Sequence, residues 1–227
     1  MKRELPVVRR RVALVLSGCG VHDGTEVHEA SFAWLALERL GMEVVCVAPD
    51  VPVATVIDHS SGAADTRGDR SVLAESARIA RGPVRALRAD VARDVAAAVF
   101  PGGYGVTRTL TDFARVGRGF AVMPAVAEFI VAMHAARKPQ VFMCTAPLLA
   151  ARVLGANGVR LTIGNDDALA SELVHCGAVH VPSNVASVVV DHANRVVSTP
   201  AFLAARGMPE LADGIDRAMR AMAELMT

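Results

Sequence analysis

The sequence predicts an α/β protein with three layers, an α/β/α sandwich built around a mostly parallel sheet. Apolar strand-like runs alternate with amphipathic helix-like stretches, as in sheets whose parallel strands are joined by crossover helices. Of the residues, 52% are hydrophobic and 4% are aromatic, which suits β-branched strands packed against alanine-rich helices. The 227 residues are enough for one well-filled core, so we expect a single domain over residues 1–227.

The chain is expected to open with a strand, a loop and a helix. The run Arg11–Ser17 predicts the first buried strand, and the glycine-rich loop 18–24 follows it. Either Thr25 or Asp23 is expected to cap the helix, because both side chains accept hydrogen bonds from first-turn N–H groups. Gly41 is expected to end it, since glycine adopts the left-handed conformation common after helix C-termini.

The next segments continue this alternation. Glu43–Ala48 predicts a second strand, whereas residues 50–70 are polar and broken and suggest only a short strand at Thr55–Asp58. Ser71–Arg81 then predicts a helix, and Val95–Phe100 predicts another buried strand.

The second half begins with an amphipathic helix at Pro124–Arg137, whose apolar residues recur on one face. An apolar strand then runs into Cys144, and a helix follows at Leu148–Leu154. Three further strands, the last two pairing as a hairpin, and a closing helix are expected at Arg160–Ile163, Val188–Val190, Arg195–Ser198 and Glu210–Met226.

Three segments at expected strand ends contain unusual residues, namely 17–29, 101–105 and 144–147. The carboxyl ends of parallel strands meet at one edge of a sheet, and ligand sites lie there, near the point where the strand order reverses. We therefore expect a functional site to be assembled from these three segments.

Cys144 is the main candidate for a reactive side chain. It ends the apolar run from Val141 and passes directly into a helix-like stretch. A side chain at such a turn lies beside the first N–H groups of the helix, whose positive end favours a thiolate. A free cysteine at a strand end is equally consistent with a small buried hydrophobic residue, and the other two segments favour the reactive thiol.

Charge and cysteine spacing exclude several functions. The formal net charge of +1 gives no electrostatic reason to expect nucleic-acid or anionic-membrane binding, and no run approaches the roughly 20 apolar residues of a membrane helix. The cysteines show neither a CxxC pair nor zinc-ligand spacing, so we expect free thiols and no metal. A metal site at His175, Cys176 and His180 is disfavoured because no second ligand pair accompanies them.

The N-terminal segment has some features of a lipoprotein export signal. Basic residues precede the apolar run Val12–Leu16, and Leu16–Cys19 resembles a cleavage box. The apolar run is shorter than the roughly 7–15 residues that a signal peptide needs, and a strand–loop–helix pattern follows at once. We therefore expect a strand here, and the free cysteines predict a protein of the reducing cytoplasm.

Several stretches, in order along Val12–Leu225, resemble one superfamily. They are Ser17–Val21, Asp23–Ala30, Glu75–Ile79 with Arg81-Gly82, Pro101–Gly103, Phe142–Cys144 with Ala146-Pro147, and Leu161–Gly164. The chain resembles the PfpI-type proteases, the parkinsonism-associated deglycase-type proteins and the class I glutamine amidotransferase domains. Within that superfamily it is most similar to the ElbB-like glyoxalases of the enhancing-lycopene-biosynthesis group. The resemblance implies a flavodoxin-like, class I glutamine amidotransferase-like fold and a homodimer.

The resemblance also implies roles for particular residues. Cys144 matches the elbow cysteine of the superfamily, and Glu29 matches a glutamate that hydrogen-bonds this cysteine. Gly102 and Gly103, with the N–H of Thr145, match the backbone groups that hold a developing oxyanion.

The sequence leaves open which acid meets Cys144. Glu29 is favoured, but Glu26 or His28 can point inward instead, and Glu26 and Cys19 are further candidates for the pocket. A buried, protonated carboxyl that donates to the sulfur would allow Cys144 to ionise, because two adjacent anions repel each other.

One departure from the superfamily bears on activity. Protease-like and amidotransferase-like members place a histidine base where this chain has Gly164. Amide hydrolysis needs a base and a proton for the leaving amine, so those activities become less favoured, although His175 or His180 could substitute. Addition of a thiol to an aldehyde needs no leaving amine.

The sequence therefore predicts a cofactor-independent glyoxalase-type enzyme. It would convert glyoxal or a similar small 2-oxoaldehyde to a 2-hydroxy acid through a hemithioacetal on Cys144. The alternative is a non-catalytic or weakly active stress- and redox-sensing module that influences isoprenoid metabolism, since an exposed thiolate oxidises readily. A third option is a glutaminase-like subunit that needs a synthase partner.

Overall fold

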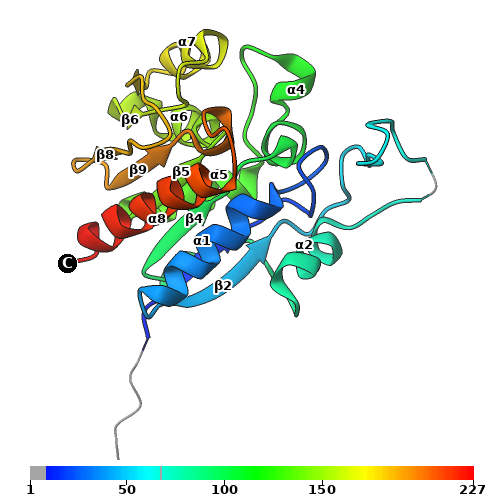
Figure 1. Ribbon diagram of the computed structural model, residues 1–227, viewed down its shortest axis with the longest axis horizontal. Helices are drawn as coiled ribbons and strands as arrows, with labels where there is room; N and C mark the ends of the chain where they lie inside the picture. Colours follow the sequence, from blue (N-terminus) through cyan, green and yellow to red (C-terminus); the bar gives the residue numbers. More distant parts are fainter. Residues whose placement is uncertain (1–8, 67) are drawn as a thin grey trace, which may run out of the picture.

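The computed structural model describes residues 9–66 and 68–227 and confirms the predicted three-layer α/β/α sandwich (Figure 1). Its main sheet has seven strands in the order β3-β2-β1-β4-β5-β9-β8. All neighbours in this sheet are parallel except β8 and β9. The strands are β1 (Arg11–Val15), β2 (Glu43–Ala48), β3 (Arg85–Ala86), β4 (Ala97–Phe100), β5 (Gln140–Met143), β8 (Val189–Asp191) and β9 (Val196–Thr199).

The strands are apolar on both sides because helices cover both faces of the sheet. All residues of β4, β5 and β9 are buried. Along β1 successive side chains alternate between faces, so Val12 and Leu14 pack on one side while Ala13 and Val15 pack on the other. The hydrophobic core is therefore divided into two clusters by the sheet.

Each of the two helical layers contributes apolar side chains to one of these clusters. Helices α1 (Val27–Arg39) and α8 (Met208–Leu225) lie side by side across one face, with α2 (Val72–Ala80) beside them (Figure 1). Helices α3 (Val91–Asp94), α5 (Pro124–Ala135) and α6 (Pro147–Leu154) cover the opposite face.

Several short elements were not predicted. Strand β3 and helix α3 are too short to show a period in sequence, and so are the π-helical turn Val106–Leu110 and helix α4 (Phe113–Val116). The expected strand at Arg160–Ile163 shortens to β6 (Arg160–Leu161), which pairs outside the main sheet with β7 (Val179–His180). Helix α7 (Asp167–His175) joins β6 and β7.

The segment 50–70 contains no strand at Thr55–Asp58, and the expectation of one was wrong. Pairing among its described residues, 50–66 and 68–70, is limited to isolated bridges, one of which joins Ile57 to Ala64. The segment, cyan in Figure 1, extends away from the body of the molecule. By contrast, the predicted hairpin is confirmed, with Val189 opposite Ser198 in β8 and β9.

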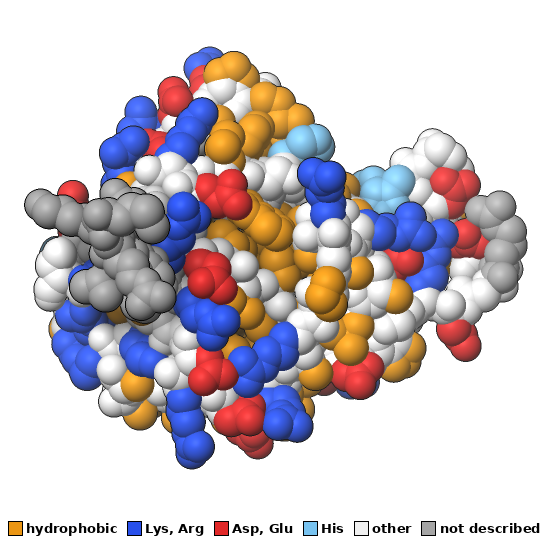
Figure 2. Space-filling view, turned by 90° about the horizontal axis from the view of Figure 1, so that it is seen from below, with side chains coloured by type: hydrophobic (Ala, Val, Ile, Leu, Met, Phe, Trp, Pro, Cys, Tyr) orange, Lys and Arg blue, Asp and Glu red, His pale blue; other side chains and the backbone are white. Residues whose placement is uncertain are grey.

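The apolar run of the signal-like segment has a structural role as strand β1. Residues 1–8 of that segment lie outside the described residues, whereas Val12–Val15 are buried in the middle of the sheet. Within residues 9–66 and 68–227, none of the helices has the length and apolar character to span a bilayer. On the face shown in Figure 2, charged side chains of both signs surround an apolar strip, as the near-neutral composition predicts.

Candidate active site

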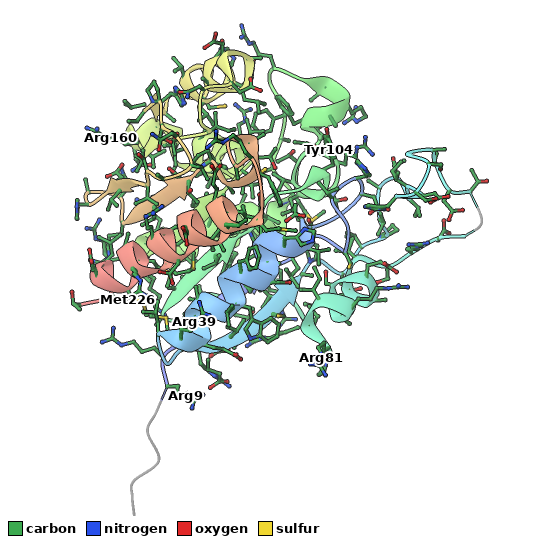
Figure 3. The ribbon with its side chains drawn as sticks, in the orientation of Figure 1. Arg9, Arg39, Arg81, Tyr104, Arg160 and Met226 are labelled. Carbon is green, nitrogen blue, oxygen red and sulfur yellow. The ribbon has the colours of Figure 1, made fainter. Side chains whose placement is uncertain are left out.

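The three strand-end segments converge at the point where the strand order reverses. From β1 the chain moves outward through β2 and β3, and it then returns to place β4 on the other side of β1. The loops after β1, β4 and β5 therefore open at one edge of the sheet. Figure 3 shows Tyr104, in the loop after β4, at the end of the molecule opposite Arg9 and Met226.

Cys144 occupies a strained turn between β5 and α6. Its φ of 54° lies in the left-handed region, which is unusual for a residue with a side chain and occurs at functional turns. The backbone N–H of Cys144 donates to the carbonyl of Thr199 at 3.1 Å, which attaches the turn to β9. The residue is 7% exposed, so its sulfur is nearly enclosed and still borders a cavity.

Glu29 lies in the first turn of α1 and is fully buried beside Cys144. Its Oε2 accepts a hydrogen bond from the N–H of Gly102 at 2.7 Å, and its Oε1 accepts one from the N–H of Phe202 at 3.2 Å. The Cys144 thiol also donates to this carboxylate. Segments far apart in sequence thus fix the carboxyl group against the sulfur.

Glu26 caps helix α1, whereas the sequence left open that it is the acid beside Cys144. Its Oε2 accepts the N–H of Glu29 at 2.7 Å and so caps α1, while its Oε1 pairs with Nδ1 of the half-exposed His28 at 2.8 Å. The expectation that Thr25 or Asp23 caps this helix was wrong. Thr25 Oγ1 instead accepts the N–H of Ser17, and Asp23 accepts the N–H of Ile57.

Gly102 allows the backbone after β4 to approach Cys144 and Glu29 closely. A Cβ at this position would lie 2.5 Å from Cβ and 2.9 Å from Sγ of Cys144, and 3.0 Å from Oε2 of Glu29. These distances are shorter than van der Waals contact, so glycine is required there.

Backbone N–H groups near this pair donate either to the Glu29 carboxylate or to the Cys144 sulfur. The N–H of Gly102 donates to Glu29, so it is not free to hold an oxyanion. The family resemblance had implied that role for Gly102. The N–H groups of Gly103 and Thr145 donate to the sulfur of Cys144 instead. The Thr145 hydroxyl donates to the carbonyl of Gly103 at 3.2 Å and ties these two loops together.

Burial sets the protonation of this pair. It raises the pKa of Glu29 to about 7, and the nearby Glu26 charge acts in the same direction. Burial also raises the pKa of the Cys144 thiol well above its ordinary value, and the Glu29 carboxylate adds to that increase. The N–H groups of Gly103 and Thr145 lower the pKa of the thiol by a smaller amount.

The expected resting state must therefore be corrected. The sequence suggested an ionised Cys144 beside a protonated Glu29, because helix-end dipoles favour a thiolate. Desolvation outweighs those dipoles, so the favoured arrangement above neutral pH is a thiol that donates to a carboxylate. In that arrangement the Glu29 carboxylate accepts a hydrogen bond from the Cys144 thiol.

The raised pKa of Glu29 predicts a pH-dependent stability. A carboxyl whose folded-state pKa exceeds its unfolded value stabilises the fold fully below about pH 4.5, and this stabilisation is lost as the pH rises through about 7. The loss is about 3 kcal/mol for a shift of this size. Denaturant unfolding between these pH values should show it for the native protein and not for Glu29→Gln. Parallel pH profiles for the two proteins would contradict the assignment.

Cys144 borders a cavity of about 470 Å³, whereas Glu29 lies behind it and is not among the lining residues. The walls are mostly apolar and include Val21, Gly103, Tyr104, Thr107, Arg108, Phe113, Ala114, Cys144, Thr145, Asp166, Leu169, Phe202 and Leu203. Cys19 and Glu26, which the sequence offered as pocket residues, are not among these lining residues. Cys19 is half-buried in the loop after β1, and Cys46 lies in the core as expected.

Sequence analysis missed Tyr104, Arg108 and Phe202. Tyr104 follows the Gly-Gly pair and was visible in the motif, whereas Arg108 and Phe202 gave no signal because only the tertiary structure brings them to the cavity.

No histidine lies among the residues that line the described cavity. Gly164, at the position where the superfamily resemblance implied a histidine, has a φ of 83°, and a Cβ there would lie 3.2 Å from Cβ of Pro200. His175 and His180 are on α7 and β7 and do not line the cavity. Across the described part of the chain, His, Cys, Asp and Glu side chains form no group of three suited to a metal ion.

Comparison with known proteins identifies the family. A rat protein named ES1 protein homolog, mitochondrial, is 42% identical over 229 residues, which span 97% of this chain and 85% of the relative. Human glutamine amidotransferase-like class 1 domain-containing protein 3, mitochondrial, is 42% identical over 230 residues with the same coverage of each chain. The chain belongs to this family of ES1 and glutamine amidotransferase-like class 1 domain proteins. No family model matches the chain.

Solved structures place the family in its superfamily. An isoprenoid biosynthesis protein with an amidotransferase-like domain from Ehrlichia chaffeensis superposes with a TM-score of 0.86 at 28% identity, over 94% of this chain and 99% of that one. Drosophila melanogaster DJ-1beta superposes at 0.58 with 18% identity, over 96% of each chain, and shows the shared fold alone. The fold is therefore of the class I glutamine amidotransferase-like type.

The relatives overturn one expectation. The sequence analysis assigned the protein to the cytoplasm on the basis of its free cysteines. Relatives that match 97% of the chain are named mitochondrial proteins, which contradicts that assignment. Free cysteines indicate a reducing environment without distinguishing one reducing compartment from another.

Proposed function

We propose that this protein is a cofactor-independent glyoxalase-type enzyme that converts a 2-oxoaldehyde to a 2-hydroxy acid. One observation carries the proposal: the sulfur of Cys144 touches the Glu29 carboxylate and two backbone N–H groups at the wall of an apolar cavity. This arrangement supports Cys144 as the nucleophile, Glu29, with a pKa of about 7, as the base, and the N–H groups of Gly103 and Thr145 as donors to an oxyanion.

The first chemical step is addition of the thiol to the aldehyde. Glu29 takes the proton of Cys144 as the sulfur forms a bond to the aldehyde carbon, and the C=O electron pair moves to oxygen. In the proposed step, the N–H groups of Gly103 and Thr145, which donate to the sulfur before the reaction, transfer their hydrogen bonds to that oxyanion and stabilise it. Glu29 then returns its proton to the oxygen, which gives a neutral hemithioacetal.

The remaining steps need no external oxidant. Glu29 removes the proton from the carbon bonded to sulfur, and the electron pair of that C–H bond forms an enediolate with its negative charge on the oxygen of the neighbouring carbon. The hydroxyl proton of the first carbon passes to that oxygen, and Glu29 returns its proton to the neighbouring carbon, so the first carbon is oxidised to a thioester while the second is reduced to an alcohol. Water then cleaves the thioester, releasing the 2-hydroxy acid and restoring the thiol. The net change is addition of one water to the 2-oxoaldehyde.

The alternatives have less support. Amide hydrolysis requires a proton for the leaving amine, and the described cavity presents no histidine that could supply it. Redox sensing requires a readily ionised and accessible thiol, whereas burial raises the pKa of Cys144 and leaves it 7% exposed. Single-domain organisation over residues 1–227 and a homodimer are further parts of the proposal.

Incubation of the purified protein with glyoxal tests the proposal. Glycolate should accumulate in proportion to the glyoxal consumed, without added thiol or nicotinamide cofactor, and nuclear magnetic resonance can follow both compounds. Absence of glycolate above the level of a buffer control would contradict the proposed activity.

A further inference from the structure

The cavity beside Cys144 is large for the simplest substrate. Its volume is about 470 Å³, and pockets of roughly 300–1,000 Å³ typically accommodate drug-sized ligands. Glyoxal, the smallest dialdehyde, would leave most of this space empty. The aromatic and aliphatic walls formed by Phe113, Leu169, Phe202 and Leu203 favour an apolar body in the remainder.

The two charged side chains that line the cavity differ in whether they are free to bind a ligand. Arg108 and Asp166 both line it, but Asp166 caps α7 by accepting the N–H of Leu169 at 2.9 Å. Among the described residues, Arg108 forms no ion pair with a carboxylate, whereas Arg115 pairs with Asp112 at 2.9 Å. Arg108 is thus the cationic side chain of the cavity with capacity for an added anion.

Arg108 is also held in a defined orientation. Its Nη1 donates to the carbonyl of His22 at 2.9 Å, and its guanidinium lies over the ring of Tyr104 at 5.1 Å from the ring centre. These contacts leave other N–H groups of the guanidinium for a ligand, and a guanidinium can bind a carboxylate through two parallel hydrogen bonds. An oriented, partly desolvated cation that faces an apolar cavity suits an amphiphilic anion.

We infer that the ligand of this cavity is an apolar carbonyl compound that carries a carboxylate, with its carbonyl at Cys144 and its carboxylate at Arg108. The inference rests on the proposed function for the orientation of the carbonyl group. It extends that function by naming the substrate class: a 2-oxoaldehyde with an aromatic or aliphatic body and an anionic end.

Equilibrium binding of two unreactive probes tests this inference by calorimetry. Para-acetylbenzoate has a carbonyl, an apolar ring and a carboxylate, and acetophenone has the same structure without the carboxylate. The native protein should bind para-acetylbenzoate about tenfold or more tightly than acetophenone, because the carboxylate gains a charge-assisted hydrogen-bonded pair. In Arg108→Gln this preference should fall to about twofold or less.

Two controls make the result specific. Arg88→Gln removes an exposed arginine that pairs with Asp90 near β3 and should retain the native preference. Arg108→Lys keeps the charge without the planar guanidinium and should show an intermediate preference. Equal binding of the two probes by the native protein, an unchanged preference in Arg108→Gln, or no binding of either probe would overturn the inference.

The binding result is independent of catalysis. If glyoxal is not converted but the preference for para-acetylbenzoate depends on Arg108, the proposed reaction fails while the ligand class stands. If glyoxal is converted but the two probes bind equally, the reaction stands and the role of Arg108 fails.

Discussion

Replacing Cys144 with alanine is expected to reduce the rate of glyoxal conversion by about a thousandfold or more, because the hemithioacetal cannot form without the nucleophile. The fold should persist. Alanine removes only the sulfur, with its hydrogen bonds to Glu29, Gly103 and Thr145, at a cost of about 1 kcal/mol for each bond. Glycolate formation and thermal unfolding measure the two effects separately.

A second cysteine provides the matched control. Cys176 follows α7, is half-buried and does not line the cavity. Cys176→Ala should convert glyoxal at the native rate, which would exclude a general effect of thiol loss. Equal rates for the native protein and Cys144→Ala would show that the observed turnover does not pass through this sulfur.

Replacing Glu29 with glutamine is expected to lower the rate by about a hundredfold to ten-thousandfold, the usual contribution of a positioned general base. The native rate should rise as the pH passes through about 7, where Glu29 loses its proton. The variant should lack this rise. Glutamine can accept from only one of the N–H groups of Gly102 and Phe202 through its single oxygen, so some loss of stability is also expected.

Glu38→Gln is the control for this change. Glu38 lies on the same helix, α1, where its Oε1 accepts the indole N–H of Trp34 at 2.9 Å on the surface. Its variant should keep both the native rate and the rise near pH 7. A Glu29→Gln protein with the native pH profile would show that another group accepts the proton.

Much of the fold was predictable because local sequence patterns indicate most of its longer strands and helices. Apolar runs marked β1, β2, β4 and β5, and the alternation with helices indicated a parallel sheet. The exact bounds Glu43–Ala48 of β2 match the prediction, since Pro49 and Gly41 enclose that run. Elements of two to four residues, such as β3 and α3, contain too few positions to show a period.

The residues of the candidate site were easier to predict from the sequence than their protonation states. Cys144 and Glu29 could be chosen from strand-end motifs and family resemblance, and the structure brings them together. Their protonation depends on how much water reaches them, which is a tertiary property. Arg108 likewise meets Cys144 at the cavity only because the loops after β4 and β5 converge.

Titration of the Cys144 thiol tests the central claim that Glu29 is the proton acceptor of a neutral thiol. Thiolate absorbance in the ultraviolet, taken as the difference from Cys144→Ala, gives the pKa for the native protein and for Glu29→Gln. The claim predicts a thiol at pH 7 in the native protein and a lower thiol pKa in Glu29→Gln, because the neighbouring negative charge is removed. A native thiolate at pH 7 whose pKa rises in Glu29→Gln would contradict it.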